Sequence, residues 1–248
     1  MKTAVKYFLQ AILGFENYLY FFSRYKIRTL KKDRKEGDFF YFLNLLPKKG
    51  TVLDIGANIG IMTVHLASEK QRTVIAFEPM PRNLQALIKI VRHYDLSNVL
   101  IKEFALGNEE GSVQMVMPMV GPVRMQGLSH VLHDSIPENN EGEKITVEVH
   151  KLDLIPEVME ADLITGIKMD VENFEYYVLE GGKEMLRKNN PILYIELWDN
   201  ENRSRCFELL KKLGYSVFVI EQNQLVEFRK QDKQNFIFLP SDYKRIPD

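Results

Sequence analysis

The segment TVLDIGANIGIMTVHL, residues 51–66, decides how the rest of the chain is interpreted. Its first half, TVLDIG, is a β-branched and apolar run that ends at a glycine, which is typical of a buried parallel strand. After Gly60, apolar side chains recur at the spacing of a short helix. A strand, a glycine-containing turn and a helix in this order predict the start of a nucleotide-binding βαβ unit.

The glycines of this turn are spaced differently from those of a dinucleotide-binding protein. A nicotinamide-binding turn has the pattern G-x-G-x-x-G, whose second glycine lets a pyrophosphate approach the backbone. Here three other residues separate Gly56 from Gly60, so that second glycine is missing. Asp54 also precedes the turn, where its charge would repel a pyrophosphate and attract a cation. The turn therefore favours a cationic ligand, and an NAD-binding Rossmann oxidoreductase stays as the alternative.

A second carboxylate, Glu78, follows the next predicted strand, TVIAFEP (73–79), 24 residues after Asp54. A carboxylate at this distance can accept hydrogen bonds from ribose hydroxyls. S-Adenosylmethionine combines a ribose with a sulfonium and an ammonium group, so the pair Asp54 and Glu78 favours this cofactor. Each residue also has a structural interpretation, Asp54 as the cap of its own turn and Glu78 as an exposed charge at a strand end.

Alternating strand and helix patterns predict a Rossmann-like, doubly wound α/β domain. Pro81 suits the first turn of a crossover helix, and further helices are expected from Phe174 to Pro191 and over 201–213. Only a turn precedes the last strand, so one late strand of a mostly parallel, seven-stranded sheet should run antiparallel. The later strands are VLIKEFAL (99–106), DLITGIKMD (162–170), ILYIELW (192–198), YSVFVIE (215–221) and NFIFLP (235–240).

Residues 111–150 interrupt this alternation and are interpreted as an inserted β-hairpin. GSVQMVM (111–117) and KITVEVHKLD (144–153) are typical of half-exposed strands. The loop from 118 to 142 is longer than packing requires and contains proline, glycine and methionine. Such a loop indicates a lid or a substrate-binding segment.

Residues 1–48 are expected to form a helical extension of a catalytic domain over 49–248. The uncharged run YFLQAILGF (7–15) lacks a signal-peptide cleavage site and is far shorter than the roughly 20 residues of a membrane span. It is typical of an amphipathic helix that either packs on the domain or brings residues 1–25 into peripheral contact with a membrane.

Two further segments complete the extension. The charged run from 26 to 37 predicts a solvated connector, and DFFYFLNLLPKKG (38–50) predicts a short apolar helix stopped by Pro47.

Composition excludes some partners. Lysine and arginine number 33 against 34 aspartates and glutamates, a formal net charge of −1, so no charge excess favours a nucleic acid. The single cysteine, Cys206, forms no intrachain disulfide and is expected in the core of a protein from a reducing compartment, which predicts a cytoplasmic location.

A second group of charged residues lies in GIKMDVENFEYYVLEGG (166–182). Lys168 and Asp170 surround the end of a predicted strand, where open α/β sheets place ligand-contacting residues. Glu172 and Glu175 come at the start of the next helix, where carboxylates are stabilised by free N–H groups. A capping role is therefore an equally good interpretation of these two glutamates.

Five segments in chain order resemble the FkbM family of class I S-adenosylmethionine-dependent methyltransferases, over approximately residues 50–200. They are VLDIGANIG, AFEPMPRNLQAL, FALGNEEGSV, GIKMDVENFEYYVLEGG and PILYIELW. The resemblance implies that Glu78 holds the ribose, that Ala105 lies near the adenine, and that the methionine side is lined by Asp54, Gly56, Asn58 and Gly60. Asn173 stands where the family usually has glycine, and asparagine tolerates the left-handed backbone that a tight turn would need.

The resemblance further implies O-methylation of a hydroxyl, on a sugar, a glycan or a secondary metabolite. An alcohol acceptor must lose a proton, so a base is expected near it, and Asp170 and Glu172 are the favoured candidates. Glu196 and the loop histidines His130 and His133 are further candidates, although the histidines are expected to be solvated loop residues. No residue spacing specifies a metal site. A noncatalytic cofactor-binding module stays as a second alternative, because Asn173 replaces the glycine and the base is not assigned.

Overall fold

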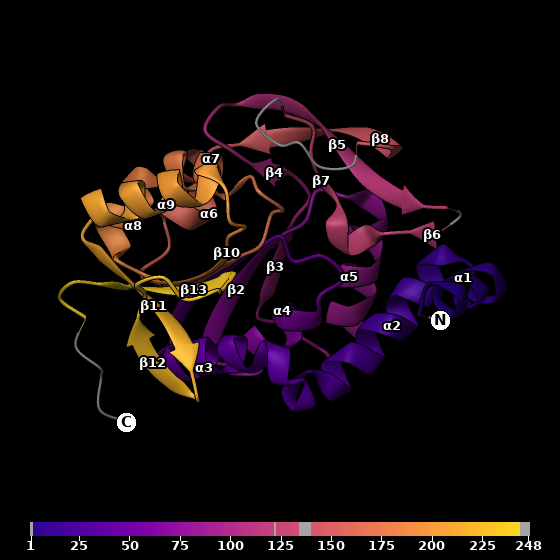
Figure 1. Ribbon diagram of the computed structural model, residues 1–248, viewed down its shortest axis with the longest axis horizontal. Helices are drawn as coiled ribbons and strands as arrows, with labels where there is room; N and C mark the ends of the chain where they lie inside the picture. The colour runs from indigo at the N-terminus through magenta and orange to yellow at the C-terminus, as the bar shows by residue number, and fades with distance from the viewer. Residues whose placement is uncertain (1, 122, 134–139, 244–248) are drawn as a thin grey trace.

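The computed structural model describes residues 2–121, 123–133 and 140–243, which form an α/β fold around an eight-stranded sheet (Figure 1). The strands follow the order β12-β11-β13-β10-β9-β1-β2-β3. Their bounds are β1 (Gly50–Ile55), β2 (Arg72–Phe77), β3 (Val99–Lys102), β9 (Ile164–Met169), β10 (Ile192–Glu196), β11 (Tyr215–Glu221), β12 (Gln224–Glu227) and β13 (Asn235–Pro240).

The central strands are parallel, and the strand direction reverses where the sequence pattern predicts it. β1 pairs in parallel with both β2 and β9, whereas β13 runs antiparallel between β10 and β11. The expected count of seven strands is wrong by one, because β12 forms within the predicted final connection. Gln222 and Asn223, with φ values of 51° and 61°, make the two-residue turn that joins it to β11.

Alternate residues of each strand bury opposite faces of the sheet. Leu53 and Ile55 pack into one hydrophobic layer, and Val52 packs into the other. The first layer is covered by α7 (Glu175–Glu180), α8 (Lys183–Asn189) and α9 (Glu201–Lys212), and the second by α3 (Gly37–Leu45) and α4 (Ile61–Leu66). Helix α5 (Pro81–His93) contributes Ile90 to the second layer.

The helix expected from Phe174 to Pro191 is two helices, α7 and α8. Gly181 stands between them, and a Cβ atom at this position would overlap the carbonyl oxygen of Gly107. The Asp153 carboxylate accepts hydrogen bonds from the backbone N of Glu184 (3.0 Å) and of Met185 (2.8 Å), which caps the start of α8. Asp153 belongs to the short 3-10 helix η4 (Leu152–Leu154), ahead of α6 (Pro156–Met159).

The expected strand 99–106 is also divided. β3 stays in the main sheet, while β4 (Ala105–Leu106) pairs with β8 (Gly142–His150) in a second sheet. β8 pairs antiparallel with β5 (Gly111–Val120), which confirms the inserted hairpin. The predicted loop from 118 to 142 contains β6 (Val123–Arg124), the 3-10 helix η3 (Gln126–Leu128) and β7 (His130–Val131), and its residues 122 and 134–139 lie outside the described residues.

The N-terminal extension consists of α1 (Lys2–Leu13) and α2 (Phe15–Thr29), followed by the 3-10 helices η1 (Leu30–Lys32) and η2 (Arg34–Glu36). α2 packs against α4 and α5, and the Ser23 hydroxyl donates to the carbonyl of Ile59 at 2.8 Å. The expected connector over 26–37 is wrong in its first part, because α2 continues to Thr29 and Ile27 is buried. Within the described residues, no helix is long and apolar enough to cross a membrane.

Candidate active site

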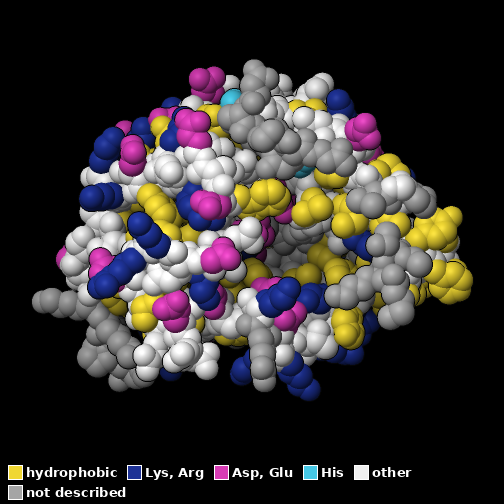
Figure 2. All heavy atoms as spheres, in the orientation of Figure 1, with side chains coloured by type: hydrophobic (Ala, Val, Ile, Leu, Met, Phe, Trp, Pro, Cys, Tyr) yellow, Lys and Arg dark blue, Asp and Glu magenta, His cyan; other side chains and the backbone are white. Residues whose placement is uncertain are grey.

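A pocket lies at the carboxyl ends of β1, β2 and β9, and residues of the inserted sheet complete its wall. Figure 2 shows a hollow in the middle of one face of the molecule, with hydrophobic and acidic side chains around it. Six of the residues expected at the site line this pocket: Gly56, Asn58, Glu78, Ala105, Asp170 and Glu172. The insertion adds Met115, Gln126, Gly127, Ser129 and Val131, and the last four belong to the loop over 118–142 that is interpreted as a lid or a substrate-binding segment.

The first turn of the pocket depends on Gly56. Its φ of 74° lies in the left-handed region, and a Cβ atom there would overlap the carbonyl oxygen of Asp170. The backbone N of Asp170 in turn donates to the carbonyl of Ile55 at 3.1 Å. The ends of β1 and β9 therefore meet at this glycine, which brings two segments 114 residues apart in the chain to one side of the pocket.

Glu78 connects this first turn to the next one. Its Oε2 accepts from the backbone N of Asn58 at 2.7 Å, and its Oε1 accepts from the backbone N of Met80 at 2.9 Å. The side chain of Asn83 donates to the same Oε1 at 3.4 Å. Burial raises the pKa of Glu78 to about 7, even though these hydrogen bonds act in the opposite direction. Glu78 is therefore not the exposed strand-end charge of its structural interpretation.

Asp54 and Gly60 are the two expected cofactor residues that the structure does not bring into the pocket lining. The Asp54 side chain is fully buried and its Oδ2 accepts from the Thr63 hydroxyl at 2.6 Å. Its Oδ1 lies 3.4 Å from Nζ of Lys168. Gly60, with a φ of 80°, precedes the first residue of α4. Asp54 of β1 thus contacts one residue of α4 and one of β9, which is a structural role different from the expected capping of its own turn.

Lys168 is buried directly behind the pocket. Its Nζ donates to the carbonyl oxygen of Gly56 at 2.7 Å, in addition to its ion pair with Asp54. Burial alone lowers the pKa of Lys168, but the carboxylates of Asp54 and Asp170 raise it above its usual value. The ammonium group therefore stays charged and holds the negative charge of the strand ends in place.

Asp170 is the aspartate of this group that lines the pocket. Burial raises its pKa, the charge of Asp54 acts in the same direction, and Lys168 opposes the shift. Glu196, at the end of β10, is absent from the pocket lining. Burial and the charge of Asp170 raise the pKa of Glu196 to about 7. Asp170 is consequently a stronger base than an exposed aspartate, and it is one of the residues that line the pocket.

The turn after β9 orients Asp170 and Glu172. Glu172 and Asn173 have positive φ values of 53° and 75°, so the turn does need the left-handed backbone that asparagine tolerates at position 173. Glu175 is buried, and its Oε1 accepts from the backbone N of Val171 (3.1 Å) and of Asn173 (3.2 Å). Burial raises the pKa of Glu175 to about 8. Of the two glutamates, Glu175 supports the turn and Glu172 lines the pocket.

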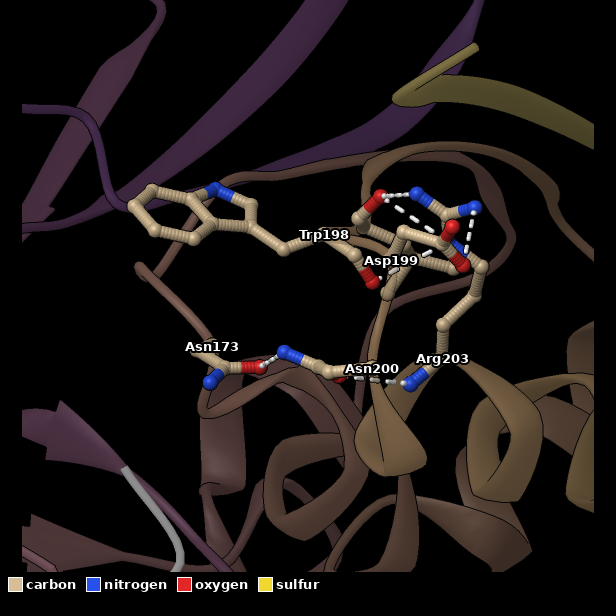
Figure 3. A network of polar contacts seen from close by, with 6 residues as sticks. Asn173, Trp198, Asp199, Asn200 and Arg203 are labelled. Carbon is tan, nitrogen blue, oxygen red and sulfur yellow. Dashed lines mark hydrogen bonds and ion pairs between the residues drawn. The ribbon is translucent and has the colours of Figure 1, made fainter. Parts of the chain in front are cut away.

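A network of asparagines fastens this turn to the start of α9 (Figure 3). Oδ1 of Asn173 accepts from Nδ2 of Asn200 at 2.8 Å, and the backbone O of Asn173 accepts from Nδ2 of Asn202 at 2.9 Å. Figure 3 shows the indole of Trp198 directed away from Arg203. Sequence reasoning missed Asn200 and Asn202, because no spacing relates them to Asn173 before the chain is folded.

The histidines do not enter the pocket lining. His130 lies in β7 with 2 % of its surface exposed, so the expectation of a solvated loop residue is wrong for it. Its Nδ1 is 2.9 Å from the carbonyl oxygen of Leu128, and its Nε2 is 3.1 Å from Oδ1 of Asn140. The ring of His133 lies against that of Tyr177, with 4.9 Å between their centroids. Among the residues described here, no three His, Cys, Asp or Glu side chains are grouped to hold a metal ion.

The chemistry of the pocket fits a nucleoside cofactor such as S-adenosylmethionine. In the described part of the chain, the buried Oδ1 atoms of Asn58 and Asn83 have no hydrogen-bond donor, and both residues line the pocket. Together with Glu78 they offer acceptors to hydroxyl and amino groups. Apolar lining residues beside them, among them Phe77 and Phe104, suit the faces of a base.

Comparison with known proteins gives matches to methyltransferases. The family model described as the methyltransferase FkbM domain matches residues 54–217. A curated relative, Methyltransferase 1 from Beauveria bassiana (strain ARSEF 2860), is 25 % identical over 187 residues, which cover 70 % of this chain and 75 % of that protein.

A solved structure, methyltransferase FkbM from Methylobacillus flagellatus KT, matches with a TM-score of 0.51 and 18 % identity. The match covers 77 % of this chain, and the chain spans 44 % of the length of that structure. At this identity the likeness concerns the fold, which both chains share over the matched part.

Proposed function

Because the chain belongs to the FkbM methyltransferase domain family, we propose that it transfers the methyl group of S-adenosylmethionine to a hydroxyl oxygen, on a sugar, a glycan or a secondary metabolite. One observation carries the proposal. Asp170 and Glu172, which can take up a proton, line the same pocket as Glu78 and Asn58, which can bind a nucleoside. A cofactor held by Glu78 and Asn58 would then lie in the same pocket as the base.

The residues of the first two turns are the ones that would hold the cofactor. When bound, S-adenosylmethionine supplies a methyl group activated by the positive charge of its sulfonium. Glu78 would accept hydrogen bonds from the ribose hydroxyls, and Asn58 and Asn83 would accept from further donors. Ala105 and Phe104 would lie along the adenine. Asp170 and Glu172 give this side of the pocket the negative charge that suits a sulfonium.

The acceptor hydroxyl must lose its proton as its oxygen bonds to the methyl carbon and the bond from that carbon to sulfur breaks. We assign this proton to Asp170, with Glu172 as the second carboxylate within the pocket. Burial strengthens Asp170 as a base, because the raised pKa increases its affinity for the proton. Lys168 remains charged behind the pocket, where its ammonium group pairs with Asp54 and donates to the carbonyl of Gly56.

Titration with S-adenosylhomocysteine tests the cofactor assignment. The wild type should bind it, and Glu78→Ala should weaken binding by about a hundredfold, since it removes a buried acceptor for two hydroxyls. Glu160→Ala, at an exposed acidic residue, is the matched control and should bind as the wild type does. Absence of heat and of a thermal shift with the wild type would contradict the assignment, and binding of NAD in its place would support an oxidoreductase.

Turnover separates the role of the base from that of the cofactor pocket. Asp170→Asn should bind S-adenosylhomocysteine as tightly as the wild type does. Its rate of methyl transfer, measured as the S-adenosylhomocysteine formed from S-adenosylmethionine with a panel of hydroxylated acceptors, should fall by at least about a hundredfold. Loss of both properties would place Asp170 in the cofactor site. A wild type that binds the cofactor and methylates no acceptor would favour the noncatalytic module.

A further inference from the structure

Helix α1 carries an apolar stripe that is largely exposed to solvent. Val5, Phe8, Leu9 and Ile12 are spaced i, i+3, i+4 and i+7, so they form one stripe along the helix. Their exposed fractions are 55 %, 62 %, 40 % and 63 %. In a globular protein such a stripe normally packs on the core. Here it remains exposed to solvent.

The polar side of α1 is the side that contacts the domain. Gln10 is buried, and its side-chain amide pairs with the backbone of Arg124 in β6. Its Nε2 donates to the carbonyl oxygen of Arg124 at 3.3 Å, and its Oε1 accepts from the backbone N of Arg124 at 3.4 Å. The orientation of α1 is therefore set by specific hydrogen bonds, and the exposure of its apolar stripe follows from that orientation.

Helix α2 extends this surface with aromatic and basic side chains. Phe21, Arg24, Tyr25 and Arg28 again follow the spacing i, i+3, i+4 and i+7 and share one face of the helix. Phe21 and Tyr25 are 50 % and 63 % exposed. We call the six residues Val5, Phe8, Leu9, Ile12, Phe21 and Tyr25 the apolar surface; Figure 2 shows hydrophobic side chains gathered at the right edge of the molecule, where Figure 1 places α1.

The surroundings of the apolar surface are strongly basic. Residues 1–32 contain seven lysines and arginines and one glutamate, a balance of +6 in a chain whose net charge is −1. Within the part of the chain that the structure describes, Arg24, Arg28 and Lys31 form no ion pair with a carboxylate. The positive charges of these three residues are therefore not neutralised by an ion pair, although the guanidinium of Arg24 lies over the ring of Tyr20.

We propose that the apolar surface docks on an anionic lipid bilayer. The aliphatic and aromatic side chains of α1 and α2 would enter the boundary between head groups and acyl chains, while Arg24, Arg28 and Lys31 would face the lipid phosphates. A second copy of this chain is a poorer occupant, because two surfaces of the same positive charge would have to meet.

The docking surface lies beside the candidate active site. Gln126 and Gly127 of η3 line both the pocket described above and the groove between α1, α2 and η3. A bilayer seated on α1 and α2 would thus be next to the wall of the pocket. The docking proposal does not depend on the methyl-transfer proposal, since vesicle binding is measured without cofactor or acceptor.

Vesicle flotation tests the proposal with the full chain. The protein should float with vesicles of equal parts phosphatidylcholine and phosphatidylglycerol, and binding should weaken as salt is raised. The double substitution Phe8→Asp with Ile12→Asp should lower vesicle partitioning by about tenfold or more, because it places two charges in the stripe. The double substitution Arg24→Glu with Arg28→Glu should also lower vesicle partitioning by about tenfold or more, because it replaces attraction to the lipid phosphates with repulsion.

Matched controls come from exposed leucines elsewhere. Leu154 and Leu163 are 59 % and 49 % exposed, and the pair Leu154→Asp with Leu163→Asp should float as the wild type does. Circular dichroism and thermal melting should show that every variant is folded. The proposal is overturned if the wild type fails to float with the anionic vesicles, if all variants float equally, or if the apolar surface instead holds a dimer that Phe8→Asp with Ile12→Asp dissociates.

Discussion

At the scale of single residues, Lys168 is a charged side chain buried in the protein interior. It is buried between the carboxylate of Asp54 and the carbonyl oxygen of Gly56, and it compensates the negative charge at the ends of β1 and β9. Its removal would leave buried carboxylates without a counter-charge. Lys168→Met should therefore lower the free energy of unfolding by about 3–5 kcal/mol.

Urea denaturation at neutral pH measures this effect. Lys212→Met removes an exposed lysine and should stay within about 0.5 kcal/mol of the wild type. Acidification should restore part of the stability of Lys168→Met, because protonation removes the uncompensated charge. A Lys168→Met protein as stable as the control would show that the ion pair contributes no net stability.

Glu175 should make stability depend on pH. Its pKa is raised from 4.5 to about 8 in the folded protein, so the folded state binds the proton more tightly than the unfolded chain. Its contribution to stability is complete below about pH 4.5 and is lost as the pH rises through about 8, at up to about 1.4 kcal/mol per pH unit. Glu175→Gln keeps an Oε1 acceptor for Val171 and Asn173 and should flatten the decline between about pH 5 and 8.

Free energies of unfolding measured between about pH 5 and 8 test whether stability falls as the pH rises. Glu208→Gln, at an exposed glutamate, should leave the wild-type profile unchanged. Glu78 and Glu196 also have raised pKa values, so Glu175→Gln should retain part of the slope. A slope identical to that of the wild type would mean that Glu175 is already ionised in the folded protein.

At the scale of elements, the start of α8 is capped by a residue from another element. Asp153 of η4 accepts hydrogen bonds from two backbone N–H groups at the start of α8. An N-cap residue normally accepts these hydrogen bonds, but here the acceptor comes from outside the helix. Asp153→Ala should lower the free energy of unfolding by about 1–2 kcal/mol, because it leaves these groups without an acceptor.

Thermal or chemical denaturation can resolve a change of this size. Asp162→Ala, at an exposed aspartate, is the control for the loss of charge alone. Asp153→Asn keeps one side-chain oxygen and should recover part of the loss. Equal stabilities for Asp153→Ala and the control would show that solvent replaces the cap.

At the scale of the whole molecule, the two N-terminal helices differ in how they are joined to the domain. Leu19 of α2 is fully buried, whereas Phe8 of α1 is 62 % exposed. Leu19→Ala should cost about 2–5 kcal/mol, as expected for a cavity in a packed core. Phe8→Ala should change stability by less than about 0.5 kcal/mol, although it removes more side-chain atoms.

The same denaturation experiment on both variants makes this comparison. A large loss for Phe8→Ala would mean that α1 packs on the domain through its apolar stripe. A small loss for Leu19→Ala would mean that α2 is not part of the cooperative fold. Either result would also remove the structural basis of the docking proposal.

Much of the fold could be predicted because local patterns and tertiary structure agree. The apolar runs of β1 and β2 are buried on both faces of the sheet, so their composition alone identifies central strands. The eighth strand, β12, could not be predicted, since Gln224–Glu227 is half-polar and becomes a strand only by pairing with β11. The division of the helix after Phe174 into α7 and α8 could not be predicted either, because it depends on the contact of Gly181 with Gly107.

For the site, the sequence by itself determined which residue types lie at the ends of the strands. Gly56, Glu78 and Asp170 follow runs whose apolar composition requires burial, and parallel strands bring their carboxyl ends to one edge. Only the tertiary structure decided which of the residues at the strand ends line the pocket. Asp54 and Asp170 are both aspartates near the carboxyl end of an apolar strand. In the structure, however, Asp54 contacts Thr63 and Lys168, whereas Asp170 lines the pocket. The physical reason is that a strand specifies the order of its side chains, whereas their partners come from distant segments that meet only in the folded chain.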